Sequence, residues 1–253
     1  MHFLKLLKIE RIKCKRSKII PFIFIAPILV VSSGVANLST YFTPEYTQAW
    51  PAMFIQSALL YAYYLLPFSM IVVCVMITGQ ENSHNGLLKM LALPVNRHTL
   101  SLAKFCILVF YLLMEILVFL AVFVIAGYIA VVTSGITETL PLSYLLKWCA
   151  GLFLTMLPSL SVMWMLTVLF EKPLLSVGLN LLLVIPGLLA GATSAWFLYP
   201  YCYSGYLVSR SLQAFTTEVT ADTALQLFPF IPCAVLIFTL ALFISASRFC
   251  KQT

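Results

Sequence analysis

Glu115 is the acidic residue that the sequence places clearly inside a long apolar run, which begins near residue 105. A charged side chain at membrane depth costs about 2.5–3.5 kcal/mol even on insertion scales. We therefore expect its carboxyl group to be protonated, paired across a helix interface or exposed to a polar cavity. A proton-coupled carrier would use such an acid. The simpler alternative is a hydrogen bond between helices, to a Ser, Thr or Tyr hydroxyl group.

Motifs for other kinds of chemistry are absent from the sequence. His2, His84 and His98 lie outside the apolar runs, and no His-Glu-x-x-His motif exists to hold zinc. There is neither a Gly-x-Ser-x-Gly nucleophile elbow nor a Gly-x-x-x-x-Gly-Lys-Ser/Thr phosphate loop. We therefore expect no catalytic residue, no metal site and no cofactor bound by this chain, and ATP-driven work would need a separate subunit. The 7 cysteines are odd in number and are expected to be free, buried thiols.

A polar stretch between residues 79 and 104 carries the clearest candidate for a binding surface. Leu87, Met90 and Leu91 share one helical face at i, i+3, i+4 spacing, and Pro94 ends the helix. The sequence therefore predicts a short amphipathic helix on the membrane surface. It is either an interfacial loop or a docking surface for a cytoplasmic partner. The residues of this candidate surface are Glu81, Asn85, Gly86, Leu87, Lys89, Met90, Leu91, Pro94 and Arg97.

The composition indicates that these residues belong to an integral membrane protein. Of 253 residues, 62% are hydrophobic and 9% are charged. A soluble domain has about 45–50% apolar and about 25% charged residues, so this chain lacks the polar surface that it would need in water. This excludes a disordered chain, a secreted disulfide-bonded scaffold and an ordinary soluble enzyme.

Six apolar runs are long enough to cross a bilayer, which takes about 20 residues in a helix. They do not alternate as membrane β-strands do, and a helix satisfies its own backbone hydrogen bonds. The sequence therefore predicts an all-α membrane protein with six transmembrane helices in a single transmembrane domain, 1–253. The predicted spans are 19–38, 57–79, 105–132, 146–169, 174–196 and 229–247.

The basic residues predict the orientation of these spans. An even number of crossings puts both termini on one side, and with that side cytoplasmic only Lys147 and Arg210 of the 15 Lys and Arg residues lie outside. The basic segment 1–18 is expected to be an anchor to anionic headgroups on the cytoplasmic face, worth about 1 kcal/mol per Lys or Arg, rather than a nucleic-acid site. We interpret the run that follows as an uncleaved first helix instead of a signal peptide.

A longer external segment, 198–228, separates the last two predicted spans. Its tyrosines, Tyr199, Tyr201, Tyr203 and Tyr206, are typical of an interfacial aromatic belt, or they contact an amphipathic peptide that leaves the membrane. In the fourth span, Pro158 indicates either an ordinary kink or a broken helix that lines a substrate path.

The stretch from Trp50 to Lys104 resembles the permease subunits of type-2 ABC exporters. Within that superfamily it is most similar to the lantibiotic-immunity permeases, the E and G subunits of three-component immunity transporters. The residues that carry the resemblance are Trp50, Leu66-Pro67, Glu81, Asn85-Gly86, Leu93-Pro94-Val95-Asn96-Arg97 and Lys104, together with the basic N-terminal segment.

The resemblance implies a mechanism and a set of partners. Two permeases, identical or paralogous, would each rest the surface helix from Glu81 to Arg97 on an ABC ATP-binding subunit, which binds ATP and Mg²⁺. The implied substrate is a lantibiotic, a cationic amphipathic peptide expelled from the bacterial plasma membrane. Three alternatives stay open: an ABC permease for another hydrophobic substrate, a proton-coupled carrier that uses Glu115, and an intramembrane enzyme whose nucleophile or metal site the sequence does not reveal.

Overall fold

The computed structural model confirms the predicted all-α class. Within the residues that it describes, all regular structure is helical, and six helices are long and apolar enough to cross a membrane. The described residues are 3–15, 19–36, 49–82, 97–134, 140, 142–170, 172–216 and 227–249. The six candidate spans are Ile19–Ala36, Gln56–Gly79, His98–Ala130, Leu142–Leu169, Pro173–Gly191 and Phe228–Arg248.

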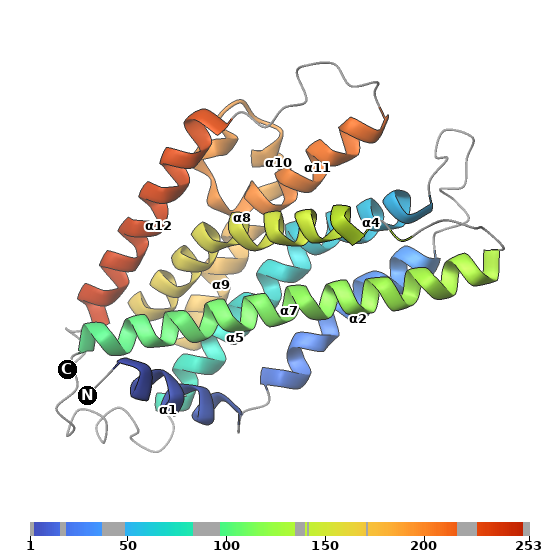
Figure 1. The fold of residues 1–253 in the computed structure, drawn as a ribbon. Helices are drawn as coiled ribbons and strands as arrows, with labels where there is room; N and C mark the ends of the chain where they lie inside the picture. The colour runs from blue at the N-terminus through green and yellow to red at the C-terminus, as the bar shows by residue number, and fades with distance from the viewer. Residues whose placement is uncertain are drawn as a thin grey trace.

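The spans form one bundle in which successive helices run in opposite directions (Figure 1). A helix before the first span, α1, lies at the end of the bundle where α12 finishes, as an even number of crossings requires (Figure 1). Which side of the membrane this end faces stays a prediction. The helices in chain order are α1 (Phe3–Lys15), α2 (Ile19–Ala36), α4 (Ala49–Leu60), α5 (Leu66–Asn82), α7 (Arg97–Ser134), α8 (Leu142–Leu169), α9 (Pro173–Val184), α10 (Gly187–Gly191), α11 (Tyr203–Thr216) and α12 (Leu227–Phe249).

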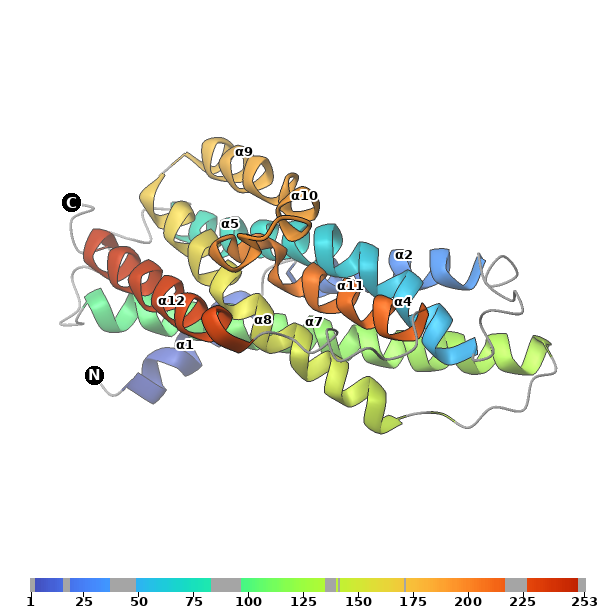
Figure 2. The ribbon, with the colours of Figure 1, turned by 90° about the horizontal axis from the view of Figure 1, so that it is seen from above.

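Helix α7 is the longest element and runs along α2 through the bundle (Figures 1 and 2). Its 38 residues give a length of about 57 Å at 1.5 Å per residue, well above a hydrocarbon core of about 30 Å. It begins at Arg97, ahead of the apolar run from residue 105. The hydropathy of the sequence marks only the apolar part of a helix, so the polar first turns were not predicted as part of this span.

An aromatic cluster forms part of the core where α4, η1 and α7 meet. Phe54 contacts Phe123 edge to face, with ring centroids 5.5 Å apart, and Tyr61 stacks on Phe119 at 4.4 Å. At Gly127 of α7 the ring of Trp50 approaches so closely that an added Cβ atom would collide with it. The two helices are therefore fitted to each other side chain by side chain.

Two proline positions shape the spans differently. Pro158 lies within the continuous helix α8, and the Ser161 hydroxyl group donates to its carbonyl oxygen at 2.7 Å. The second span instead contains a π-helical turn, η1 (Tyr61–Leu65), just before Pro67. Because proline has no N–H to donate, it disturbs the regular hydrogen bonds of the preceding turn. The irregular backbone of the second span lies at η1.

Candidate functional site

Helix α1 is fixed to the bundle by a buried ion pair. Glu10 Oε2 accepts a hydrogen bond from Lys104 Nζ of α7 at 3.3 Å, and its Oε1 accepts one from Lys13 Nζ at 2.7 Å. Glu10 is 2% exposed and Lys104 is 1% exposed. Breaking such a pair by removing one partner leaves a buried charge and costs about 3–5 kcal/mol. The ion pair therefore fixes the position of α1 on α7.

Cys14 lies in the same contact between α1 and α7, and its pKa reflects the exclusion of water there. The thiol is buried, and this burial, reinforced by the nearby Glu10 carboxylate, raises the pKa of Cys14 to about 11. Thiolate formation is therefore suppressed while α1 stays in place. The basic composition of this segment predicts a headgroup anchor and does not predict the Glu10–Lys104 pair. The available signal was that Glu10 is the one acid in an otherwise basic stretch.

Glu115 lies in the apolar part of α7, fully buried. The Ser69 hydroxyl group of α5 donates a hydrogen bond to Glu115 Oε2 at 2.5 Å. This is the hydrogen bond between helices that was the simpler alternative from the sequence. Oε1 has no hydrogen-bond partner among the described residues, and neither has the buried hydroxyl group of Tyr61. One of the two carboxyl oxygens of Glu115 is therefore available for a further hydrogen bond.

The segment after α10 folds back into the bundle instead of leaving it. It forms two short turns, η3 (Trp196–Leu198) and η4 (Pro200–Cys202), and then α11 (Figure 2). The Ser159 hydroxyl group of α8 donates to the Pro200 carbonyl oxygen at 2.7 Å, and the Ser204 hydroxyl group donates to the Ala62 carbonyl oxygen in η1 at 2.8 Å. This segment, residues 196–210, thereby covers the irregular turn of the second span.

The four tyrosines of this segment are used mainly for internal packing. The Tyr201 hydroxyl group donates to Asn180 Oδ1 at 2.9 Å, and the Tyr199 hydroxyl group donates to the Leu183 carbonyl oxygen at 2.5 Å. Tyr203 and Tyr206 pack with Trp196, and Tyr206 stacks on its ring at 3.9 Å. Three of the four, Tyr201, Tyr203 and Tyr206, are buried, and Tyr199 is half-buried. Their contact with a substrate stays a prediction.

The comparison with known families decides the class of this molecule. The sequence model of the ABC-2 family transporter proteins matches residues 6–187, from α1 into α10. The match covers more than half of the chain.

The chain belongs to the ABC-2 transporter family.

As an ABC-2 transporter protein, it is a multi-pass membrane subunit of a transport system that works with an ABC ATP-binding partner. A search of the curated proteins finds no match. Among the described residues, no three His, Cys, Asp or Glu side chains lie close enough to hold a metal ion.

The predicted docking residues of this ABC-2 chain fall mostly outside the described residues. Residues 83–96 are not described, and of Glu81 and Arg97 only the backbone is, in α5 and α7. The end of α5 and the start of α7 lie at the same end of the bundle as α1 (Figure 1). The segment that joins them therefore starts and finishes at the end of the bundle that carries α1. The docking role of this segment stays a prediction.

Proposed function

We propose that this chain is the permease subunit of an ATP-driven ABC exporter that expels a lantibiotic or a similar amphipathic antimicrobial peptide from the bacterial plasma membrane. The match to the ABC-2 transporter family over residues 6–187 carries the permease assignment. The resemblance of the stretch from Trp50 to Lys104 to immunity permeases supports the peptide class. The exporter would give the cell immunity or resistance to that peptide.

The ATP-binding subunit, with its ATP and Mg²⁺, would dock on the segment between α5 and α7. Support comes from the position of this segment, because its two ends continue directly into helices that cross the bundle. A displacement of the segment would be passed to α7, and through Lys104 to α1. A second permease, identical or paralogous, would complete the translocation path.

The docking role is tested by co-purification. Scrambling residues 83–96, which leaves the described helices intact, should abolish recovery of the ATP-binding subunit with the tagged permease. A scramble of residues 217–226, which are predicted to lie on the opposite side of the membrane, is the control and should retain the partner. Unchanged recovery with the first scramble would contradict the docking assignment.

The transport role is tested in a peptide-sensitive bacterial host. The chain is expressed with the ATP-binding subunit and any second permease from the adjacent reading frames, and the minimal inhibitory concentration of lantibiotics is measured. We expect it to rise, and we expect the rise to vanish when the ATPase glutamate of the partner is changed to glutamine. Protection against an unrelated apolar drug but not against the peptides would leave the permease role intact and refute the substrate class.

A proton-coupled carrier is the second candidate, favoured by the unpartnered Oε1 atom of buried Glu115. It predicts export that follows the transmembrane pH gradient and persists with the inactive ATPase. Export that requires ATP hydrolysis and ignores a protonophore would exclude the carrier.

A further inference from the structure

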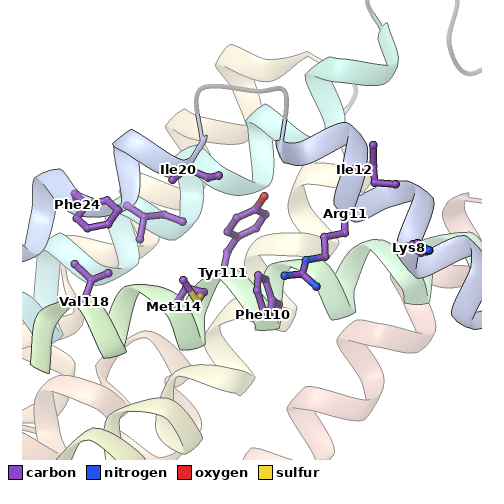
Figure 3. A pocket seen from close by; sticks show the side chains of 10 residues that line it. Lys8, Arg11, Ile12, Ile20, Phe24, Phe110, Tyr111, Met114 and Val118 are labelled. Atoms are coloured by element: carbon purple, nitrogen blue, oxygen red, sulfur yellow. The ribbon is translucent and has the colours of Figure 1, made fainter. Parts of the chain in front are cut away.

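A groove runs along the outside of the bundle where α1, α2 and α7 meet. It encloses a cavity of about 400 Å³, and it is lined by side chains from all three helices (Figure 3). Its two ends differ in chemistry. Lys8 and Arg11 lie at one end, whereas Phe24 and Val118 lie at the other (Figure 3).

The basic end of the groove is positioned by contacts within the chain. The Arg11 guanidinium group lies over the Phe110 ring, 5.1 Å from its centroid. Lys8, one helical turn earlier on α1, is exposed. The acidic residue of α1, Glu10, does not neutralise these charges, because it is buried against Lys104 and Lys13. The groove therefore presents two cationic donors at one end.

The apolar end continues along α7 into the membrane-spanning part of the bundle. From Phe110 to Val118 the helix rises about 12 Å at 1.5 Å per residue. Ile20, Phe24 and Met114 line this part and are 43%, 42% and 39% exposed. Each is a large hydrophobic side chain of a spanning helix that faces outward from the protein. The floor of the groove is therefore apolar and open to lipid.

We propose that this groove binds one anionic phospholipid, with its phosphate between Lys8 and Arg11 and an acyl chain against Ile20, Phe24 and Met114. Basic pockets between membrane helices are suited to anionic headgroups, and a guanidinium group matches a phosphate with two parallel donors. A cationic peptide substrate would be repelled by the same two side chains. The proposed lipid site therefore does not depend on the proposed substrate.

The bound lipid would contact α1, α2 and α7 at once. It would add to the hold that the Glu10–Lys104 pair has on α1. The basic N-terminal segment thus acts through a site of defined stoichiometry as well as through diffuse attraction to the membrane surface.

The proposal is tested with the full-length chain purified in detergent. Phosphatidylglycerol and phosphatidylcholine are titrated in turn, bound lipid is counted by native mass spectrometry, and Tm is recorded. We expect one phosphatidylglycerol per chain and a rise in Tm that phosphatidylcholine does not give. Equal effects of the two lipids, or an equal effect of inorganic phosphate, would overturn the proposal.

Variants distinguish lipid binding in this groove from general attraction of an anionic lipid to a basic protein. Lys8→Gln with Arg11→Gln should weaken phosphatidylglycerol binding about 30-fold. Lys5→Gln with Lys172→Gln removes the same charge from exposed positions outside the groove and should leave binding unchanged. Met114→Trp, which fills the apolar end and keeps both charges, should also abolish the bound lipid. Equal losses in the groove and control pairs, or a lipid retained by Met114→Trp, would refute the site.

Discussion

The two buried carboxyl groups of the described chain, Glu10 and Glu115, are held in opposite ways. Glu10 lies at the end of the bundle and pairs with two ammonium groups, those of Lys13 and Lys104. Glu115 lies deep in a span and has one hydroxyl partner, Ser69. Near the end of the bundle a lysine can reach a buried acid while its stem packs on apolar neighbours. In the apolar interior the chain uses a neutral partner, because a second charge there would have to be desolvated as well.

The largest effect should follow from breaking the charged contact. Lys104→Met leaves Glu10 buried with Lys13 as its remaining ion-pair partner, and should destabilise the packing of α1 on α7 by about 3–5 kcal/mol. Protease sensitivity of α1 and the Tm of the purified chain measure the loss. Adding Glu10→Leu to Lys104→Met should recover part of it, because no buried charge then remains in the pair. A double variant no more stable than Lys104→Met would show that the pair does not hold α1.

Cys14 should report the same event through its chemistry. Its pKa of about 11, against 9.0 for the ordinary thiol, means about 100-fold less thiolate in the docked state at neutral pH. Alkylation of Cys14 by a maleimide, followed by mass spectrometry, should be slow in the parent and should accelerate by about that factor in Lys104→Met. Cys14 holds its proton more tightly while α1 packs against α7. The packing of α1 on α7 should therefore weaken as pH rises from 9 toward 11. Equal alkylation rates in parent and variant would contradict a buried Cys14.

A smaller effect is expected from the neutral contact. Ser69→Ala removes the hydrogen bond that Ser69 donates to Glu115 and leaves a buried carboxyl group unsatisfied, at a cost of about 1–3 kcal/mol. Thermal unfolding in detergent measures the cost. Ser32→Ala is the matched control, because the Ser32 hydroxyl group is exposed and bonds within its own helix. A cost at Ser69 no larger than at Ser32 would show that Glu115 does not depend on this partner.

The smallest effect should come from Glu115→Gln. The amide oxygen can still accept the Ser69 hydrogen bond, so assembly should be preserved and stability should change by less than about 1 kcal/mol. The same substitution at Glu10 should cost more, since it removes a charge that faces two lysines. Measured side by side, the two glutamine variants test the comparison directly. Equal costs would remove the distinction between the two carboxyl groups.

The sequence predicted the spans and the depth of Glu115, because hydropathy over about 20 residues and a charge inside an apolar run are local signals. It did not reveal which hydroxyl group contacts Glu115, since Ser57 and Ser69 lie in the same span and both are buried. The pairing of Glu10 with Lys104 could not be predicted from the sequence either. That contact joins residues 94 positions apart and depends on how α1 folds back onto α7.

The tyrosines of residues 196–210 also show how far composition predicts structure. A row of tyrosines near a span predicts a belt at the membrane surface, but the same residues serve when a segment folds inward. Tyr201 is buried because its hydroxyl group finds Asn180 on α9. Such a partner is visible only once the segment after α10 has been placed against the bundle.

The close contact between Gly127 and Trp50 limits how α7 can move. The Trp50 ring fills the space beside this glycine, and the helix is unbroken from Arg97 to Ser134. A force on the first turn of α7 therefore acts on one continuous helix, which is held against α4 near its other end, at Gly127. If α7 slid along its own axis, the Trp50 ring would meet side chains larger than glycine. A displacement of α7 would therefore carry α4 with it.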